Sequence, residues 1–119
     1  MPQPTLLNKG DIVLVPFPFA DLSGQKLRPA IIVSANPQGN ELIIAFITSV
    51  LGNRSPRGAE IELRQSDSEF ALTGLKTDSL IRLDKVVTLT RNLVSRRLGH
   101  AGPATSARIV TMLRRALDL

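Results

Sequence analysis

The 119-residue chain contains no cysteine, tryptophan or tyrosine, and its only histidine is His100. The absence of cysteine excludes disulfides, thiol catalysis, zinc ribbons and iron–sulfur clusters together. A single histidine excludes mechanisms that need a histidine pair and argues against a histidine-based metal site. Because the four phenylalanines are the only aromatic residues, nucleic-acid recognition through aromatic stacking would be sparse.

Long apolar runs are also missing. No run approaches the roughly 18 residues that a membrane-spanning helix needs. Residues 1–9 lack the charged start and apolar core of a signal peptide. We therefore expect a cytoplasmic protein with no membrane association, no bound metal and no cofactor.

The composition that remains is that of a folded, basic domain. Apolar residues make up 43% of the chain and charged residues 21%, which is enough to form a core. The length favours one domain over residues 1–119. The net charge of +5 favours a polyanionic partner.

Short apolar and β-branched runs dominate the first two-thirds of the chain. A turn-forming cluster at residues 36–40 predicts a hairpin, and residues 50–58 predict an exposed loop. Residues 67–76 fit either a short helical turn or irregular chain. Strands are predicted at residues 11–15, 29–34, 41–48, 59–63, 79–83 and 86–90, with a further short candidate at 93–98.

The apolar period changes after Gly99. A helix is predicted to begin at Gly102-Pro103, because proline suits the first helical turn. One face would carry Ile109, Met112, Leu113, Ala116 and Leu117. Several short strands followed by one helix predict a mainly β (α+β) fold, a small, strongly bent barrel with the helix packed against it.

Two positions at strand ends are candidates for chemistry. Arg28 precedes Pro29 where a polar loop enters a strand, so its side chain would leave a stiffened, extended backbone. Thr48 and Ser49 end the third strand, where their hydroxyls could line a groove. Taken alone, Arg28 is more simply explained as a surface arginine at a strand start, and Thr48 and Ser49 fit ordinary strand and turn roles.

Charged residues supply the other candidates. Arg82 and Asp84 stand two apart, so they would project from one face of a continuing strand, either as a surface ion pair or as a functional pair. Lys26 lies beside Arg28, and Arg54 and Arg57 lie in the next basic loop. Two such loops beside a concave surface would form a phosphate track, although solvated charge is the simpler explanation.

Four motifs occur in a collinear order that is more specific than any one of them. They are Lys-Gly-Asp-Ile-Val-Leu-Val at residues 9–15, Leu-Arg-Pro-Ala-Ile-Ile-Val-Ser at 27–34, Ile-Thr-Ser at 47–49, and Ser-Leu-Ile-Arg-Leu-Asp-Lys-Val-Val-Thr-Leu at 79–89. Together with Leu98-Gly99 and the terminal amphipathic helix, they resemble the MazF/PemK family of bacterial toxins. The resemblance runs from about Asn8 to the C-terminus.

This resemblance implies an SH3-like barrel of the PemK/MazF type that forms a homodimer. It also implies a growth-inhibiting toxin of a type II toxin–antitoxin pair, a metal-independent endoribonuclease that cuts single-stranded RNA and is silenced by a cognate antitoxin. The catalytic residues carried over are Arg28, Thr48, Arg82 and Asp84, and the RNA-binding candidates are Lys26, Ser49, Arg54 and Arg57.

The chemistry of RNA fits these residues, because its own 2′-hydroxyl attacks the neighbouring phosphorus. In a dry surrounding Asp84 would take the proton as a general base. Arg28 would clamp the phosphate, Arg82 would stabilise its charge, and Thr48 would orient phosphate or ribose.

The chain also departs from the family pattern. Residues 23–27 lack the acidic residue that better-known members carry before Arg-Pro, and Leu14 stands where an aromatic often occurs. Phe17 and Phe19 would pack at the barrel edge, stack on bases or meet the antitoxin. A non-catalytic binder on the same fold, like the gyrase-poisoning toxins, is the alternative function.

Overall fold

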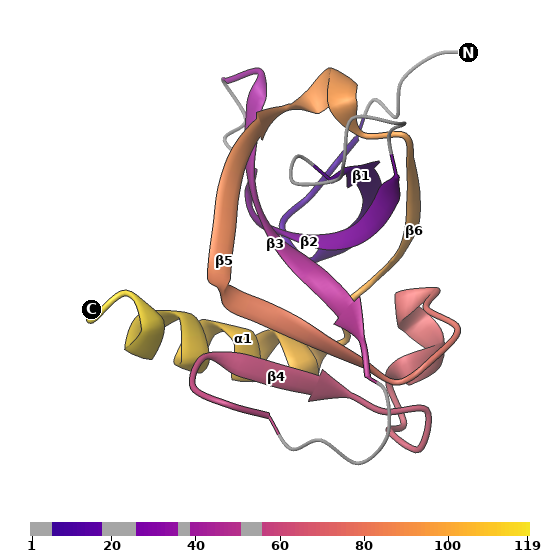
Figure 1. Ribbon diagram of the computed structural model, residues 1–119, viewed down its shortest axis with the longest axis vertical. Helices are drawn as coiled ribbons and strands as arrows, with labels where there is room; N and C mark the ends of the chain where they lie inside the picture. The colour runs from indigo at the N-terminus through magenta and orange to yellow at the C-terminus, as the bar shows by residue number, and fades with distance from the viewer. Residues whose placement is uncertain (1–5, 18–25, 36–38, 51–55) are drawn as a thin grey trace.

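The computed structural model describes residues 6–17, 26–35, 39–50 and 56–119. It contains six strands and one α-helix, with two short 3₁₀ helices, η1 and η2, between strands (Figure 1). The elements in chain order are β1 (Asp11–Pro16), β2 (Leu27–Ala35), β3 (Glu41–Ser49), β4 (Glu60–Leu63), η1 (Phe70–Thr73), β5 (Ser79–Thr90), η2 (Arg91–Leu93), β6 (Arg96–His100) and α1 (Pro103–Ala116).

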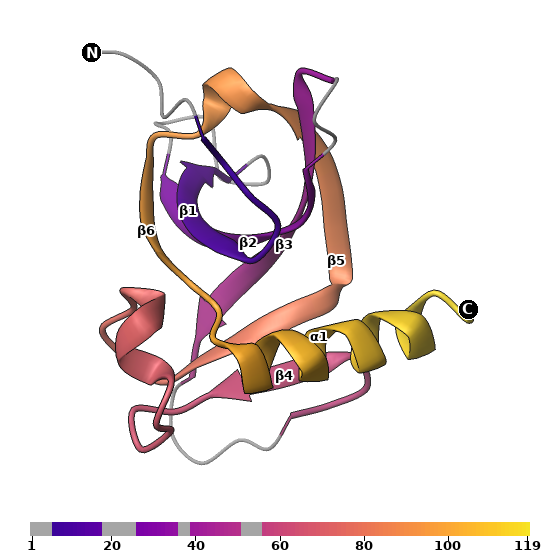
Figure 2. The ribbon, with the colours of Figure 1, turned by 180° about the vertical axis from the view of Figure 1, so that it is seen from behind.

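The six strands form one antiparallel sheet in the order β4-β5-β3-β2-β1-β6. Figures 1 and 2 show the sheet curled into a half-barrel, with α1 lying beside β4 at one end. The mainly β fold with a terminal helix is therefore confirmed. No helix within the described residues is long and apolar enough to cross a membrane.

Both faces of the central strands are buried. Along β2, Ile31 and Val33 belong to one apolar cluster, whereas Ala30 and Ile32 belong to the other. The first cluster packs against Met112 and Leu113 of α1, whereas the second joins residues of β1, β2 and β3. Strands buried on both sides read as continuous apolar runs, which explains why these segments show no polar alternation.

Shifts of register bend the ladder at three places: between Ile12 and Val13, between Ile32 and Ser34, and between Ala45 and Ile47. An extra residue in one strand increases the local twist, and this closes a sheet into a barrel. The two central shifts lie in the strands that position the candidate site.

The two strands predicted at 79–83 and 86–90 are wrong, because β5 is one strand that pairs with β3 along most of its length. Asp84 and Lys85 resemble a turn in the sequence, but they lie in β5 close to the register shift. The candidate strand at 93–98 is also misplaced. Residues 91–93 form η2, and β6 starts at Arg96. The uncertain segment 67–76 contains η1, and residues 36–38 of the predicted hairpin lie outside the described residues.

The helix begins at Pro103 as expected. Ile109 is buried, but Leu117 is half-exposed, so the predicted apolar face is covered only over its first turns. Gly102 offers no side-chain cap, and Glu69 supplies one instead. Its carboxylate accepts hydrogen bonds from the backbone N–H groups of Thr105 at 2.9 Å and Ala104 at 3.0 Å. These bonds lower the pKa of Glu69 below its ordinary value.

The buried Asp11 joins the N-terminal segment to β6. Its carboxylate accepts a hydrogen bond from the Asn8 backbone at 2.9 Å and pairs with Arg97 Nε at 3.2 Å. A guanidinium nitrogen of Arg97 also lies 3.2 Å from His100 Nδ1. The single histidine thus belongs to a structural contact at the start of the sheet.

Candidate active site

Residues of three neighbouring strands enclose a hollow of about 300 Å³. Arg28 comes from the start of β2, Thr48 from the end of β3, and Arg82 from β5. We call this space the Thr48 hollow. Its lining residues are Phe17, Arg28, Phe46, Ile47, Thr48, Arg82 and Lys85.

Strand geometry accounts for this convergence. Ala30 of β2 pairs with Phe46 of β3. Because the strands are antiparallel, Arg28, two residues before Ala30, and Thr48, two residues after Phe46, lie on the same face as that pair. On the other side of β3, Ile47 pairs with Ile81 but Ala45 pairs with Val86, so residues 82–85 lie in an irregularity of β5 opposite Phe46, and Arg82 and Lys85 from it line the hollow. Residues 28, 48 and 82 are therefore brought together only by the folded sheet.

Arg28 is supported by an aromatic pair. Its guanidinium carbon lies 5.6 Å from the centre of the Phe17 ring. Phe17 in turn meets Phe46 in a T-shaped contact, with ring centres 5.2 Å apart and planes at 84°. Of the roles considered for Phe17, packing against the barrel is the one observed, and its ring also contacts the Arg28 guanidinium. Phe19 lies outside the described residues.

Arg82 is held by two carboxylates. Its Nε lies 3.1 Å from Oε2 of the buried Glu60 and 3.4 Å from Oδ1 of Asp84. Glu60 also accepts a hydrogen bond from the Arg57 backbone at 2.9 Å. The expected neighbourhood of Arg82 and Asp84 is found, whereas the role of Glu60 was missed, because its partner lies on an adjacent strand.

Asp84 itself faces solvent, with 47% of its side chain exposed. The protein alone does not supply the dry surrounding expected around a general base. A bound substrate would have to cover this carboxylate.

The RNA-binding candidates are dispersed. Ser49 follows Thr48 directly, so its side chain points to the opposite side of β3, where it lines a different hollow. Lys26 is exposed just before β2, and Arg57 is exposed before β4; neither lines the Thr48 hollow. Arg54 lies outside the described residues. Lys85, which does line the hollow, was missed although it follows Asp84 directly.

Within residues 6–17, 26–35, 39–50 and 56–119, no three histidine, aspartate or glutamate side chains cluster as a metal site would require. The chemistry available around the Thr48 hollow is that of cations, one hydroxyl and one exposed carboxylate beside Arg82. Such a set binds and polarises an anion.

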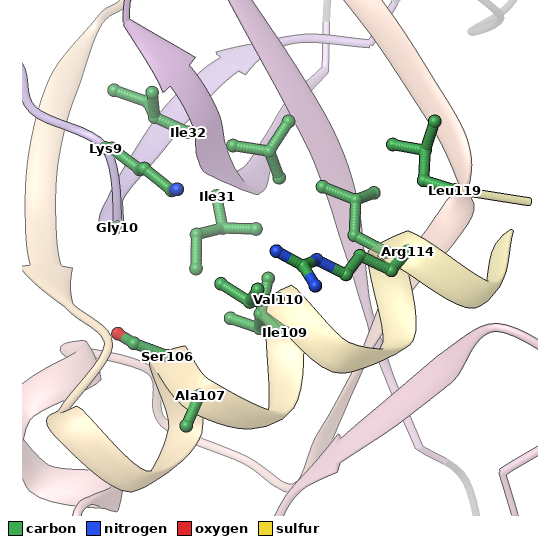
Figure 3. A pocket seen from close by; sticks show the side chains of 12 residues that line it. Lys9, Gly10, Ile31, Ile32, Ser106, Ala107, Ile109, Val110, Arg114 and Leu119 are labelled. Atoms are coloured by element: carbon green, nitrogen blue, oxygen red, sulfur yellow. The ribbon is translucent and has the colours of Figure 1, made fainter. Parts of the chain in front are cut away.

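A larger hollow, of about 450 Å³, lies between α1 and β2 and is mostly apolar (Figure 3). Ile31 and Ile109 lie deep within it, and Val110 faces it from the helix. Lys9 and Arg114 supply charge. This surface is suited to burying apolar groups of a partner rather than to catalysis.

Several solved structures share this architecture. An endoribonuclease in complex with its cognate antitoxin from a mycobacterial species has a TM-score of 0.71 at 23% identity, covering 96% of this chain and 97% of that one. MazF from Deinococcus radiodurans has a TM-score of 0.71 at 19% identity, covering 98% and 100%. The Mycobacterium tuberculosis toxin MazF-mt6 has a TM-score of 0.69 at 19% identity, covering 92% and 97%. No curated protein matches the chain significantly.

At these identities the structures establish the shared fold. The family itself follows from the sequence, because residues 8–117 match the model of the PemK-like, MazF-like toxins of type II toxin–antitoxin systems. The match includes the strands that form the Thr48 hollow as well as α1. The chain therefore belongs to the PemK-like, MazF-like toxin family.

Proposed function

We propose that this toxin is a metal-independent endoribonuclease that cuts single-stranded RNA in the Thr48 hollow. The observation that carries the proposal is the convergence of Arg28, Thr48 and Arg82 on one hollow, with Asp84 bonded to Arg82. The name endoribonuclease on similarly folded proteins supports it.

The reaction begins with the 2′-hydroxyl of the substrate. Its oxygen attacks the adjacent phosphorus, and Asp84 accepts the proton. The P–O5′ bond breaks, which leaves a 2′,3′-cyclic phosphate, and the departing 5′-oxygen takes a proton from solvent water while Asp84 releases its proton to solvent. Arg28 and Arg82 bind the phosphate oxygens, on which negative charge increases in the transition state, and the Thr48 hydroxyl donates to phosphate or ribose.

The test is cleavage of a long single-stranded RNA in EDTA, with mapping of the fragment ends. We expect discrete fragments with a 5′-hydroxyl and a cyclic phosphate, and no cutting at a 2′-deoxy position. Arg28→Ala should lower the rate about 10²–10³-fold, as loss of one transition-state donor does. Arg115→Ala, which removes an exposed cation on α1, is the matched control.

Equal cleavage by the wild type and Arg28→Ala would contradict the assignment. Binding of RNA without any fragments would favour the non-catalytic alternative instead. Both variants should melt cooperatively like the wild type, because residues 28 and 115 are exposed.

An acidic antitoxin segment would silence the toxin by competing with RNA for the same cations. Two similarly folded structures are complexes with an antitoxin or with MazE. Pre-incubation with an acidic antitoxin peptide should suppress both RNA binding and cleavage. Rising salt should weaken the binding of the peptide to the toxin. A peptide that binds while cleavage continues unchanged would exclude this form of inhibition.

Two copies of the chain would associate through the apolar hollow of Figure 3. Val110 is 39% exposed there, which leaves apolar surface available for a partner. Val110→Glu should convert a dimer to a monomer in light scattering, whereas Thr111→Glu, on a neighbouring exposed position, should not. A dimer that persists in Val110→Glu would place the interface elsewhere.

A further inference from the structure

Arg28 borders two hollows rather than one. Besides the Thr48 hollow it lines a second space of about 290 Å³, which we call the Ser49 hollow. Thr48 and Ser49 are consecutive in β3 and line different hollows, so the two spaces lie on either side of the strand, with Arg28 between them.

The Ser49 hollow is lined by three cations, Arg28, Lys76 and Arg96. Hydroxyl-bearing residues complete its polar lining: Ser49, Thr77 and Ser79. Among the residues that the structure describes, no carboxylate lines this hollow.

Within the described part of the chain these cations have no carboxylate partner, unlike three other arginines near the sheet. Arg64, Arg82 and Arg97 all pair with carboxylates. Among the residues described by the structure, Lys76 and Arg96 have no carboxylate partner. Three uncompensated charges around one hollow form an attractive site for an anion.

Asp78, the carboxylate nearest to Lys76 in the sequence, is already engaged. Asp78 accepts a hydrogen bond from the Gln65 backbone at 2.7 Å and pairs with Arg64 at 3.1 Å. Both contacts lower its pKa below the ordinary value, which keeps it ionised and committed to these partners. It therefore does not neutralise Lys76.

Residues 74–78, the segment that contains Lys76, contact the sheet through backbone atoms at both ends. Gly74 has a positive φ of 73°, and a Cβ there would lie 2.1 Å from the Leu98 carbonyl oxygen, so its backbone lies directly on β6. At the other end of the segment, Val50 donates to the Asp78 carbonyl at 2.9 Å. The backbone positions of Lys76 and Arg96 are thus fixed before any ligand binds.

We propose that the Ser49 hollow holds the nucleotide next to the scissile link, with Lys76 and Arg96 binding its phosphate. This inference rests on the proposed ribonuclease activity. A chain with a phosphate on every nucleotide can place one phosphate at Arg28 and a neighbouring one in the Ser49 hollow, which a single free anion cannot do. Lys76 and Arg96 are then positioning residues that act on binding rather than on bond cleavage.

The test uses Lys76→Ala, Arg96→Ala and the double variant, with Arg115→Ala as the control for general loss of charge. Binding is measured by anisotropy with a labelled 2′-O-methyl RNA that contains a mapped cleavage sequence. Each single variant should weaken binding about tenfold and raise KM with little change in kcat. Each should also reduce the slope of log K against log salt by about 0.7, the value for one phosphate contact on a single strand.

Lys76→Arg should retain the wild-type slope, since it keeps the charge. Variants that cleave and bind like the wild type, with an unchanged salt slope, would overturn the inference while leaving the proposed activity intact. A loss of kcat alone, or weaker binding of an acidic antitoxin peptide with RNA binding unaffected, would overturn it as well. A wild type that neither binds nor cuts RNA would refute the proposed function and this inference with it.

Discussion

The contact between Phe17 and Arg28 predicts a measurable coupling between an apolar side chain and catalysis. Phe17→Leu keeps an apolar group on the core but removes the ring below the guanidinium. Without the ring, Arg28 samples more rotamers, and the fraction poised over the Thr48 hollow falls. We therefore expect slower RNA cleavage although no group near the reacting atoms has been removed.

The magnitude follows from the geometry. At 5.6 Å from ring centre to guanidinium carbon, the contact lies within the range of cation–π attraction. At a partly exposed site this attraction is worth about 0.5–1 kcal/mol, or about two- to fivefold in rate. The lost edge-to-face contact with Phe46 would lower the free energy of unfolding by about 0.5–1.5 kcal/mol in addition.

A double-mutant cycle separates the two effects. Phe17→Leu should slow cleavage by about two- to fivefold when Arg28 is present. In an Arg28→Ala background it should not slow the residual cleavage further. Its effect on the urea midpoint should be the same in both backgrounds apart from the small cation–π contribution. If Phe17→Leu slows residual cleavage by the same factor without Arg28, the ring does not act through the arginine and the reasoning is wrong.

Three further predictions concern stability. Gly99→Ala should lower the free energy of unfolding in urea by about 3 kcal/mol, because a Cβ would lie 2.3 Å from the Leu72 carbonyl oxygen. A near-neutral effect would show that the two backbones can separate freely. Glu60→Gln should lower the free energy of unfolding by about 1 kcal/mol, because half-buried Arg82 would lose its buried charged partner and keep the exposed Asp84. An unchanged thermal midpoint would mean that Asp84 alone is enough to balance the charge of Arg82. The lowered pKa of Glu69 means that its ionised form stabilises the fold above its ordinary pKa, and that this contribution disappears as pH falls through the folded value. The stability advantage of wild type over Glu69→Gln should therefore shrink as the pH falls from the ordinary pKa of a glutamate toward the lowered pKa of Glu69 in the fold, and a constant difference would exclude this cap as its source.

The sequence predicted the strands because burial on both faces leaves a strong apolar signal. The strands predicted around Ile31 and Ile44 are confirmed, and so is the helix start predicted at Pro103. The split of β5 was wrong because the charged Asp84 and Lys85 resemble a turn, whereas the ladder with β3 continues past them.

The site was predictable only in part. Arg28, Thr48 and Arg82 were identified from local patterns and a family resemblance, and the structure brings them to one hollow. Lys76 and Arg96 had no such signal, because they reach the Ser49 hollow only through the close approach of η1 to β6. Convergence between segments far apart in the chain is set by tertiary packing and leaves no periodicity to detect.

The two partners of Arg82 suggest how the site handles charge during the proposed reaction. The contact with buried Glu60 is short at 3.1 Å, whereas both hydrogen bonds to Asp84, at 3.4 and 3.5 Å, are long and therefore weak. An arriving phosphate would displace the exposed Asp84 from the guanidinium more readily than the buried Glu60. Arg82 would then stay anchored while it binds the phosphate, and Asp84 would be released beside the substrate to accept a proton. In the proposed reaction, the unequal strength of the two contacts would thus link substrate binding to the release of Asp84 as the base.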